Sequence, residues 1–306
     1  MYAMQGYQKA RAERAAQPNA MNYIPPVISA KVYGGSVKTQ PTRRVYSTAK
    51  AATYDVNAWH RPSMERNADF EALANEPHIL IGGCTGSGKS VFMNTLLYSI
   101  IDAPHKTQFV FIDLKVVELS YYRDAPQTMA YCTTVSQTAA ALKRVREIID
   151  DRYRRMGDLG IRKWTDAQGS RIYIVIDEYA ELITQGRKLV ERELMSIAQI
   201  GRAAGVHIIA ATQRPTRDII TGAVKVNFDC RIALRTATAQ DSRNILDRNG
   251  AEKLPRFGHA IVMRAGYTET WDVPMTPDWA IEEQINDWVV QAFRANYHPG
   301  HIEIDS

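Results

Sequence analysis

The sequence predicts an α/β fold with a mostly parallel β-sheet flanked by helices. From about residue 70, short apolar runs alternate with longer amphipathic stretches, which is the order that a doubly wound parallel sheet requires. The runs are mostly apolar, as expected of strands that helices cover on both faces. The predicted strands are Ile79 to Ile81, Phe109 to Ile112, Ile172 to Ile176, His207 to Ala211, Arg231 to Leu234 and Ala260 to Met263.

Helices are predicted in the intervening stretches and after the last strand. Asp102-Ala103-Pro104 stops the first helix, Ser136 is a candidate N-cap for the second, and Gly205 follows the third. The predicted helices are Lys89 to Ile101, Ser136 to Arg155, Lys188 to Ala204 and Asp278 to Tyr297.

The domain organisation follows from length and composition. The 306 residues fit one large α/β domain with a tail as well as two average domains. Residues 1–50 are rich in Ala, Gln, Asn, Pro and Thr without a sustained period, so we expect a flexible, disordered arm. We expect a linker or short accessory segment at 51–75, the main domain at 76–275, and a C-terminal helix and tail at 276–306.

The charge is concentrated in the N-terminal arm. Residues 1–50 contain eight Lys or Arg and one acid, whereas residues 51–306 contain 30 basic and 32 acidic side chains. The net charge of +5 therefore comes from the arm. A basic arm can contact nucleic acid, anionic lipid or a docking protein. The alternative is a solvated terminus.

Secretion and membrane insertion are not indicated by the sequence. No window approaches 18 uninterrupted apolar residues, and the first residues lack the order of a signal peptide. Cys84, Cys132 and Cys230 are an odd number without a CxxC pair, which argues against disulfides and structural zinc. We expect a cytoplasmic protein with reduced cysteines.

The first predicted strand is followed by a phosphate-binding motif. Its residues match GxxxxGK[ST] and run into the first predicted helix, which begins at Lys89. Glycines let successive backbone N–H groups surround a β-phosphate, Lys89 reaches the β and γ oxygens, and the Ser90 hydroxyl ligates Mg²⁺. The motif predicts a site for ATP and Mg²⁺ over Gly83, Cys84, Thr85, Gly86, Ser87, Gly88, Lys89, Ser90 and Val91.

Polar residues follow two further strands. Asp177 and Glu178 end the strand before them, where the first carboxylate can hold the magnesium shell and the second can polarise the attacking water. Gln213 follows the next strand and is a candidate sensor of the γ-phosphate. Alternatively, the two acidic residues only end a strand at the protein surface. For Gln213, the alternative is an ordinary strand-to-loop turn that Pro215 terminates.

The chain resembles the motor domain of the FtsK/SpoIIIE DNA translocases, within the RecA-like FtsK–HerA group. The resemblance runs from about Glu76 to Val262. Its blocks include Phe111-Ile112-Asp113 with Lys115, Gly201-Arg202-Ala203-Ala204-Gly205, Ala211-Thr212-Gln213-Arg214-Pro215 and Asp241-Ser242-Arg243. Two departures from the family are Leu114 in place of its Pro and Cys84 in place of its usual Thr. We expect the chain to lack the family's N-terminal membrane helices, and its small winged-helix domain, for which the stretch after the last block leaves no room.

The resemblance implies a RecA-like ATPase that forms a ring, usually a hexamer, around double-stranded DNA. An arginine from the neighbouring subunit completes such sites, and Arg202 is the first candidate and Arg243 the second. Either could instead form a structural ion pair. Phosphate contacts without base readout are expected from Arg214, Arg217 and Lys225, unless this stretch is a solvated loop. We interpret the group of Arg152, Arg154 and Arg155 as the polar face of a helix.

The sequence analysis thus predicts an ATP-driven DNA translocase. A motor without the family's other domains resembles those of conjugative elements, plasmids and phages, with a membrane or relaxosome-type docking protein as a candidate partner of the arm. The alternatives are an ATPase of a type VII-like secretion system, which moves a polypeptide, and a regulatory ATPase with little turnover. The intact Asp177-Glu178 pair argues against the last.

Overall fold

An eight-stranded mixed sheet forms the centre of the computed structural model, which describes residues 69–102, 107–273, 276, 280–287 and 302. The chain divides into two units, Met1–Tyr54 and Asp55–Ser306, and all described residues belong to the second. The predicted arm, the linker to residue 68 and most of the predicted helix Asp278 to Tyr297 lie outside the described residues. Part of that helix is present at 280–287.

The strand order is β3-β2-β4-β5-β1-β6-β7-β8. The six strands from β3 to β6 are parallel, and β7 and β8 continue the sheet as an antiparallel hairpin. All six predicted strands are confirmed. The strands are β1 (His78–Gly82), β2 (Thr107–Ile112), β3 (Thr128–Cys132), β4 (Arg171–Ile176), β5 (Val206–Thr212), β6 (Cys230–Leu234), β7 (His259–Arg264) and β8 (Tyr267–Asp272).

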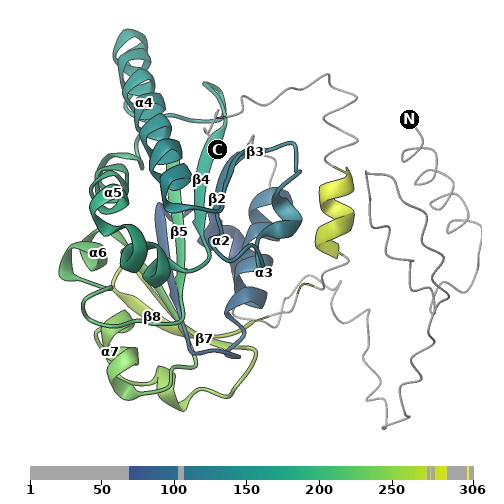
Figure 1. The fold of residues 1–306 in the computed structure, drawn as a ribbon, viewed down its shortest axis with the longest axis vertical. Helices are drawn as coiled ribbons and strands as arrows, with labels where there is room; N and C mark the ends of the chain where they lie inside the picture. The colour runs from purple at the N-terminus through teal and green to yellow at the C-terminus, as the bar shows by residue number, and fades with distance from the viewer. Residues whose placement is uncertain (1–68, 103–106, 274–275, 277–279, 288–301, 303–306) are drawn as a thin grey trace, which may run out of the picture. The chain divides into compact units, whose positions relative to one another are not determined.

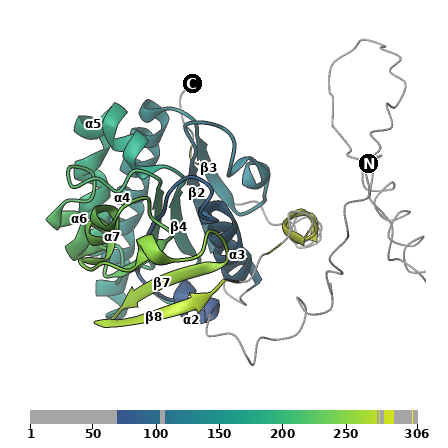
Figure 2. The same ribbon diagram turned by 90° about the horizontal axis from the view of Figure 1, so that it is seen from below.

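Helices cover both faces of the sheet (Figures 1 and 2). Alternate residues of each central strand point to opposite faces, so Leu80 packs on the side of α4 and α5, whereas Ile79 and Ile81 pack on the side of α2 and α3. Ile281, in the helix at 280–287, belongs to the core on the side of α2 and α3. The helices are α2 (Phe70–Ala74), α3 (Lys89–Asp102), α4 (Val135–Leu159), α5 (Tyr179–Ile200), α6 (Gly222–Asn227) and α7 (Ala239–Leu246).

The predicted boundaries of two helices are wrong. The N-cap of α4 is Thr134, not Ser136, because the Thr134 hydroxyl accepts from the backbone N–H of Gln137. Helix α5 begins at Tyr179 and not at Lys188, and it ends at Ile200 with Gly201 as its C-cap. Gly186 is non-helical inside α5, with φ −136°. Because glycine disfavours a helix interior, the sequence around Gly186 does not indicate that the helix begins before it.

Arg152 is not part of a polar helix face, which corrects the sequence-based interpretation. Its side chain is buried and donates to the carbonyl oxygens of Ala204 and Ser170, at 2.7 Å each. The guanidinium also lies 4.7 Å from the ring centroid of Trp164. Arg154 and Arg155 are exposed and pair with Asp151, as expected.

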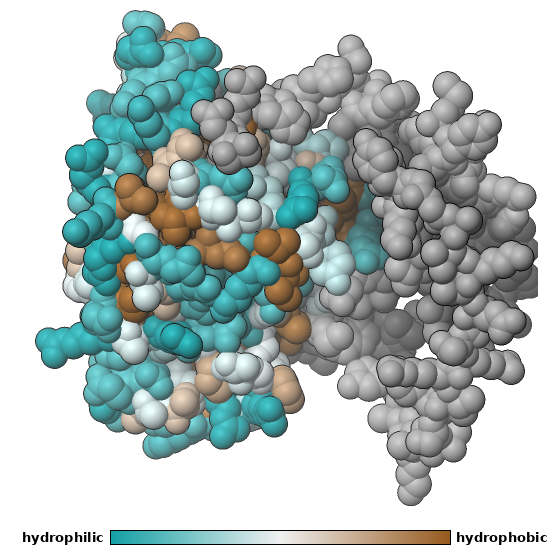
Figure 3. All heavy atoms as spheres, viewed as in Figure 1, coloured by the Kyte–Doolittle hydropathy of each residue, from teal (hydrophilic) through white to brown (hydrophobic). Residues whose placement is uncertain are grey.

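The molecular surface over α4 is mostly hydrophilic (Figure 3). In the part of the chain that the structure describes, no helix has the length and apolar character needed to cross a membrane. Large exposed apolar side chains are present elsewhere, including Val226 at 82% and Phe257 at 61% exposure. Phe257 lies in the segment between α7 and β7, close to the site described next.

Candidate nucleotide-binding site

Three loops meet at one edge of the sheet because β4, β5 and β1 are adjacent and parallel. The phosphate-binding motif follows β1, Asp177 and Glu178 follow β4, and Gln213 follows β5. Backbone hydrogen bonds join the motif to both neighbouring strands: the N–H of Gly83 donates to Thr212 O at 3.2 Å, and that of Cys84 donates to Arg235 O at 2.9 Å. The topology therefore brings together the phosphate-binding motif, Asp177, Glu178 and Gln213, but not the two predicted arginine fingers.

The motif has the backbone of a phosphate-binding loop. Gly86 and Gly88 adopt φ of 72° and 94°, which favours glycine. Helix α3 starts at Lys89, so its first N–H groups face the loop. The hydroxyl of Ser87 is buried and has no hydrogen-bond partner among the described residues. The loop therefore combines backbone donors with an unpartnered polar atom, as expected of an anion site.

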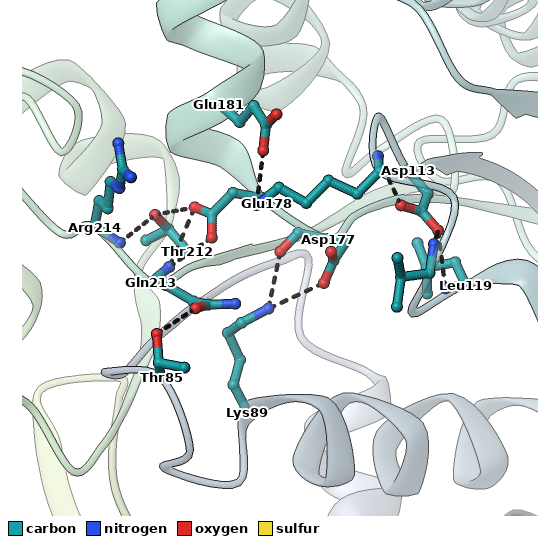
Figure 4. Close-up of polar contacts among 12 residues, drawn as sticks. Thr85, Lys89, Asp113, Leu119, Asp177, Glu178, Glu181, Thr212, Gln213 and Arg214 are labelled. Atoms are coloured by element: carbon teal, nitrogen blue, oxygen red, sulfur yellow. Dashed lines mark hydrogen bonds and ion pairs between the residues drawn. The ribbon is translucent and has the colours of Figure 1, made fainter.

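Lys89 reaches from the start of α3 to the end of β4 (Figure 4). Its ammonium lies 3.0 Å from both the carboxylate Oδ1 and the backbone O of Asp177. The two side chains are 3% and 6% exposed. The pair thus places a cation and a carboxylate next to the phosphate-binding loop.

Glu178 is held by the strand beside it (Figure 4). Its Oε1 accepts from the Thr212 hydroxyl at 2.7 Å, and its Oε2 accepts from the backbone N–H of Gln213 at 2.9 Å. The Gln213 side-chain oxygen in turn accepts from the Thr85 hydroxyl at 2.8 Å. A continuous network therefore connects the phosphate-binding loop, the second carboxylate and the end of β5.

A cavity of about 600 Å³ opens beside this network. Lys115, which follows β2, lies across from Glu178, and its ammonium is 2.8 Å from Glu181 of α5. The hydrogen bond to Glu181 raises the pKa of Lys115. Neither Lys115 nor Glu181 was predicted from the sequence as a site residue, although Lys115 follows a strand at the same edge. The lining includes Cys84, Thr85, Lys115, Glu178, Glu181 and Gln213.

Asp113 anchors the loop that carries Lys115. Its carboxylate accepts from the backbone N–H groups of Val117 and Leu119, at 2.9 and 3.1 Å, and from the Tyr131 hydroxyl at 2.9 Å. Burial, followed by the hydrogen bond to Asp113, raises the pKa of Tyr131. The other carboxylate oxygen accepts from the backbone N–H of Lys115 at 3.2 Å, so Asp113 positions Lys115 through the backbone.

The residues predicted for Mg²⁺ have suitable oxygen donors. Within the described ranges there is no group of three or more His, Cys, Asp or Glu side chains suited to a metal. Magnesium, however, is commonly held by one or two protein oxygens together with substrate phosphates. Ser90 supplies a half-buried hydroxyl, and Asp177 retains a carboxylate oxygen with no hydrogen-bond partner among the described residues. This donor set fits a phosphate-bound magnesium ion.

The two predicted arginine fingers lie away from the phosphate-binding loop of their own chain. Arg202 is exposed and precedes β5, at the opposite end of the strand from Gln213. Arg243 on α7 donates to Asn249 Oδ1 at 2.6 Å and to Gln240 Oε1 at 2.9 Å. A role for either residue in a neighbouring subunit's site stays a prediction.

The predicted DNA contacts differ in their charge environment. Arg214 and Arg217 are exposed, and neither has an ion-pair partner within the described segments. Lys225, in contrast, lies 2.5 Å from the carboxylate of Asp247 and donates to the backbone O of Arg243. Free positive charge in this stretch is therefore carried by the two arginines, and the contact through Lys225 stays a prediction.

Comparison with known proteins gives consistent matches. The family model described as the FtsK/SpoIIIE family matches residues 56–173. A DNA translocase FtsK from Sporosarcina ureae is 36% identical over 268 residues, which cover 78% of this chain and 34% of the relative. This chain thus spans about a third of the length of that relative.

Solved structures share the fold. The pCW3 conjugation coupling protein TcpA, described in a monomer form with ATPγS, is 25% identical with a TM-score of 0.64, covering 72% of this chain and 66% of that chain. The cytoplasmic domain of the type VII secretion ATPase EccC from Thermomonospora curvata is 20% identical with a TM-score of 0.60, covering 76% of this chain and 30% of that chain. The second likeness shows the fold alone. The geometry of the loop and the identity to the translocase relative together place this chain in the FtsK/SpoIIIE family.

Proposed function

We propose that this chain is an ATPase that couples ATP hydrolysis to the movement of double-stranded DNA. The observation that carries the proposal is the network of Lys89, Asp177, Glu178 and Gln213 around the phosphate-binding loop. The loop N–H groups and Lys89 would bind the polyphosphate, and Ser90 and Asp177 would hold Mg²⁺, which would neutralise charge on the phosphates. Glu178 accepts the proton of the attacking water as its oxygen bonds to the γ-phosphorus, and the bond from the γ-phosphorus to the β,γ-bridging oxygen breaks so that ADP leaves.

The connection from the nucleotide to DNA runs through the end of β5. Gln213 contacts Thr85 of the loop and is followed directly by Arg214, with Arg217 three residues later. A change at the γ-phosphate that moves Gln213 would move these exposed cations. Their contacts are to phosphates, so DNA binding should be salt-sensitive and without base readout.

Two grounds favour DNA as the substrate: the names of the relatives, and the exposed arginines without an ion-pair partner in the described residues, Arg214 and Arg217. The Sporosarcina relative is named a DNA translocase, and TcpA is named a conjugation coupling protein. We therefore propose a role in DNA transfer in the cytoplasm, by conjugation or for a plasmid, a phage or a chromosome. The proposal includes a hexameric ring completed in trans by Arg202 or Arg243, and a docking partner for the basic arm. A polypeptide substrate is the alternative.

The proposal is tested by steady-state ATPase assays with and without long linear duplex DNA at low and moderate salt. We expect DNA to raise the wild-type rate several-fold and salt to suppress the gain, because about one counterion is released per phosphate contact. Lys89→Ala should lose nucleotide binding. Glu178→Gln should retain binding and lose turnover by about 100-fold or more.

The matched control for DNA binding is Arg192→Ala, since Arg192 is an exposed arginine on α5 whose side chain is 90% exposed. Arg214→Ala with Arg217→Ala should abolish the stimulation by DNA, whereas Arg192→Ala should leave it unchanged. Hydrolysis that depends on Lys89 but ignores DNA would reject the DNA substrate and favour the polypeptide. Hydrolysis unchanged in Glu178→Gln would reject the proposed site.

A further inference from the structure

A second cation stands beside the phosphate-binding loop. Arg256 lies in the segment between the short turn Ala251–Lys253 and β7. A Cβ atom placed on Gly86 would be 3.4 Å from Nη2 of Arg256 and 3.9 Å from its Nε. A methyl group at Gly86 would therefore just touch the guanidinium, which places Arg256 beside the middle of the loop.

The charge of Arg256 is uncompensated in the described structure. No hydrogen bond or ion pair joins its side chain to another described residue, and the side chain is exposed. The charge of Lys89, by contrast, is paired with Asp177 (Figure 4). Of the two cations beside the loop, Arg256 is thus the one without a carboxylate. An unpaired guanidinium next to converging backbone N–H groups forms a site for an anion.

The neighbouring residues hold the guanidinium in place. Its central carbon lies 5.4 Å from the ring centroid of Phe257, within the range of a cation–π contact. Gly258 follows with φ 75°, and its carbonyl accepts from the backbone N–H of Val273 at 2.8 Å, which ties the segment to the sheet. The exposed ring of Phe257 therefore serves as a support for Arg256.

We propose that Arg256 binds the polyphosphate of the nucleotide as a second cation beside Lys89, with Phe257 as a positioning residue. The inference rests on the proposed function, because it requires a nucleotide in the loop. Arginine suits this task since its planar donors match two phosphate oxygens at once. No step of bond cleavage is assigned to it.

The test is the affinity for a fluorescent N-methylanthraniloyl-ATP in the presence of Mg²⁺. Arg256→Ala and the longer Arg256→Gln should weaken binding by about 10- to 100-fold, since a charge-assisted hydrogen bond is lost. Arg256→Lys should lose less of the nucleotide affinity, because it keeps the positive charge. The matched control is Lys253→Ala, which removes an exposed cation three residues away. The melting temperature of each variant shows that it is folded.

A double-mutant cycle tests the role of Phe257. Phe257→Leu should weaken binding in the wild-type background and change nothing in the Arg256→Ala background, because the ring acts through the guanidinium. Wild-type affinity in Arg256→Ala, with binding lost in Lys89→Ala, would overturn this inference and leave the ATPase intact. Wild-type affinity in Lys89→Ala would overturn the proposed function, and this inference with it.

Discussion

At the scale of single residues, Thr212 determines how Glu178 is held. Its hydroxyl donates to Glu178 Oε1 at 2.7 Å and accepts from the backbone N–H of Arg214 at 3.1 Å. The side chain is fully buried, so water cannot replace either bond. The hydroxyl therefore connects the carboxylate proposed to activate water with the start of the loop proposed to contact DNA.

Replacing this hydroxyl should impair turnover more than binding. In Thr212→Val the shape is kept, but Glu178 loses one charge-assisted hydrogen bond, and we expect kcat to fall by about tenfold. Nucleotide affinity should stay within about twofold, since the contact of Thr212 with the phosphate-binding loop is through its backbone carbonyl, which the substitution leaves in place. The control is Thr184→Val, because that hydroxyl faces the same cavity but donates to Ala180 O. Equal kcat values for the two variants would contradict the prediction.

At the scale of elements, apolar runs and motif spacing explain what could be predicted from the sequence. Six strands are visible as short apolar runs, and the residues after β1, β4 and β5 were assigned correctly to one edge. Strand β3 was missed although four of its five residues are buried. Strand β8 was missed because five of its six residues are exposed. Lys115 and Thr212 were missed as site residues because their roles depend on contacts with distant segments.

Arg152 ties the middle of α4 to the loop before β5. Burial is the main cause that lowers its pKa to about 10, followed by the charge of Arg155. It remains charged at neutral pH because three carbonyl oxygens accept its hydrogen bonds. A residue on a helix that looks polar in sequence is thus a core contact between α4, the segment at Ser170 and β5.

Removing this contact should destabilise the domain. Arg152→Met keeps the aliphatic stem but leaves the buried carbonyl of Ala204 and the partly buried carbonyl of Ser170 without this donor, so we expect a loss of about 2–4 kcal/mol in the free energy of unfolding. Arg155→Met is the control, since its exposed pair with Asp151 is worth about 0.5 kcal/mol or less. Urea unfolding of the two variants gives both values. A loss in Arg152→Met as small as in Arg155→Met would show that Arg152 is dispensable.

At the scale of the whole molecule, the two edges of the sheet differ in their charge chemistry. The edge at the ends of β1, β4 and β5 presents the nucleotide site, whereas the opposite edge buries two histidines. The Nδ1 atom of His78 accepts from the backbone N–H of Ile208 at 3.1 Å, and Nδ1 of His207 lies 3.2 Å from Glu76 O. Arg202 and Arg171 add positive charge near them. Both rings are therefore kept neutral at the edge of the sheet opposite the nucleotide site, where β1 and β5 begin.

Acid should therefore destabilise the domain well above the range in which carboxylates titrate. Burial, reinforced by neighbouring positive charge, lowers the pKa of His78 to about 3 and that of His207 to about 4. The unfolded chain takes up protons near pH 6.5 but the folded chain does not, so stability is intact above pH 6.5 and falls as the pH decreases toward 4. We expect about 2–4 kcal/mol less free energy of unfolding at pH 5 than at pH 7, measured by urea unfolding.

His207→Gln should lose about half of this pH dependence, whereas the control His259→Gln, whose ring is partly exposed beside Asp272, should retain it. A stability that is equal at pH 7 and pH 5 would mean that these rings are protonated in the folded protein.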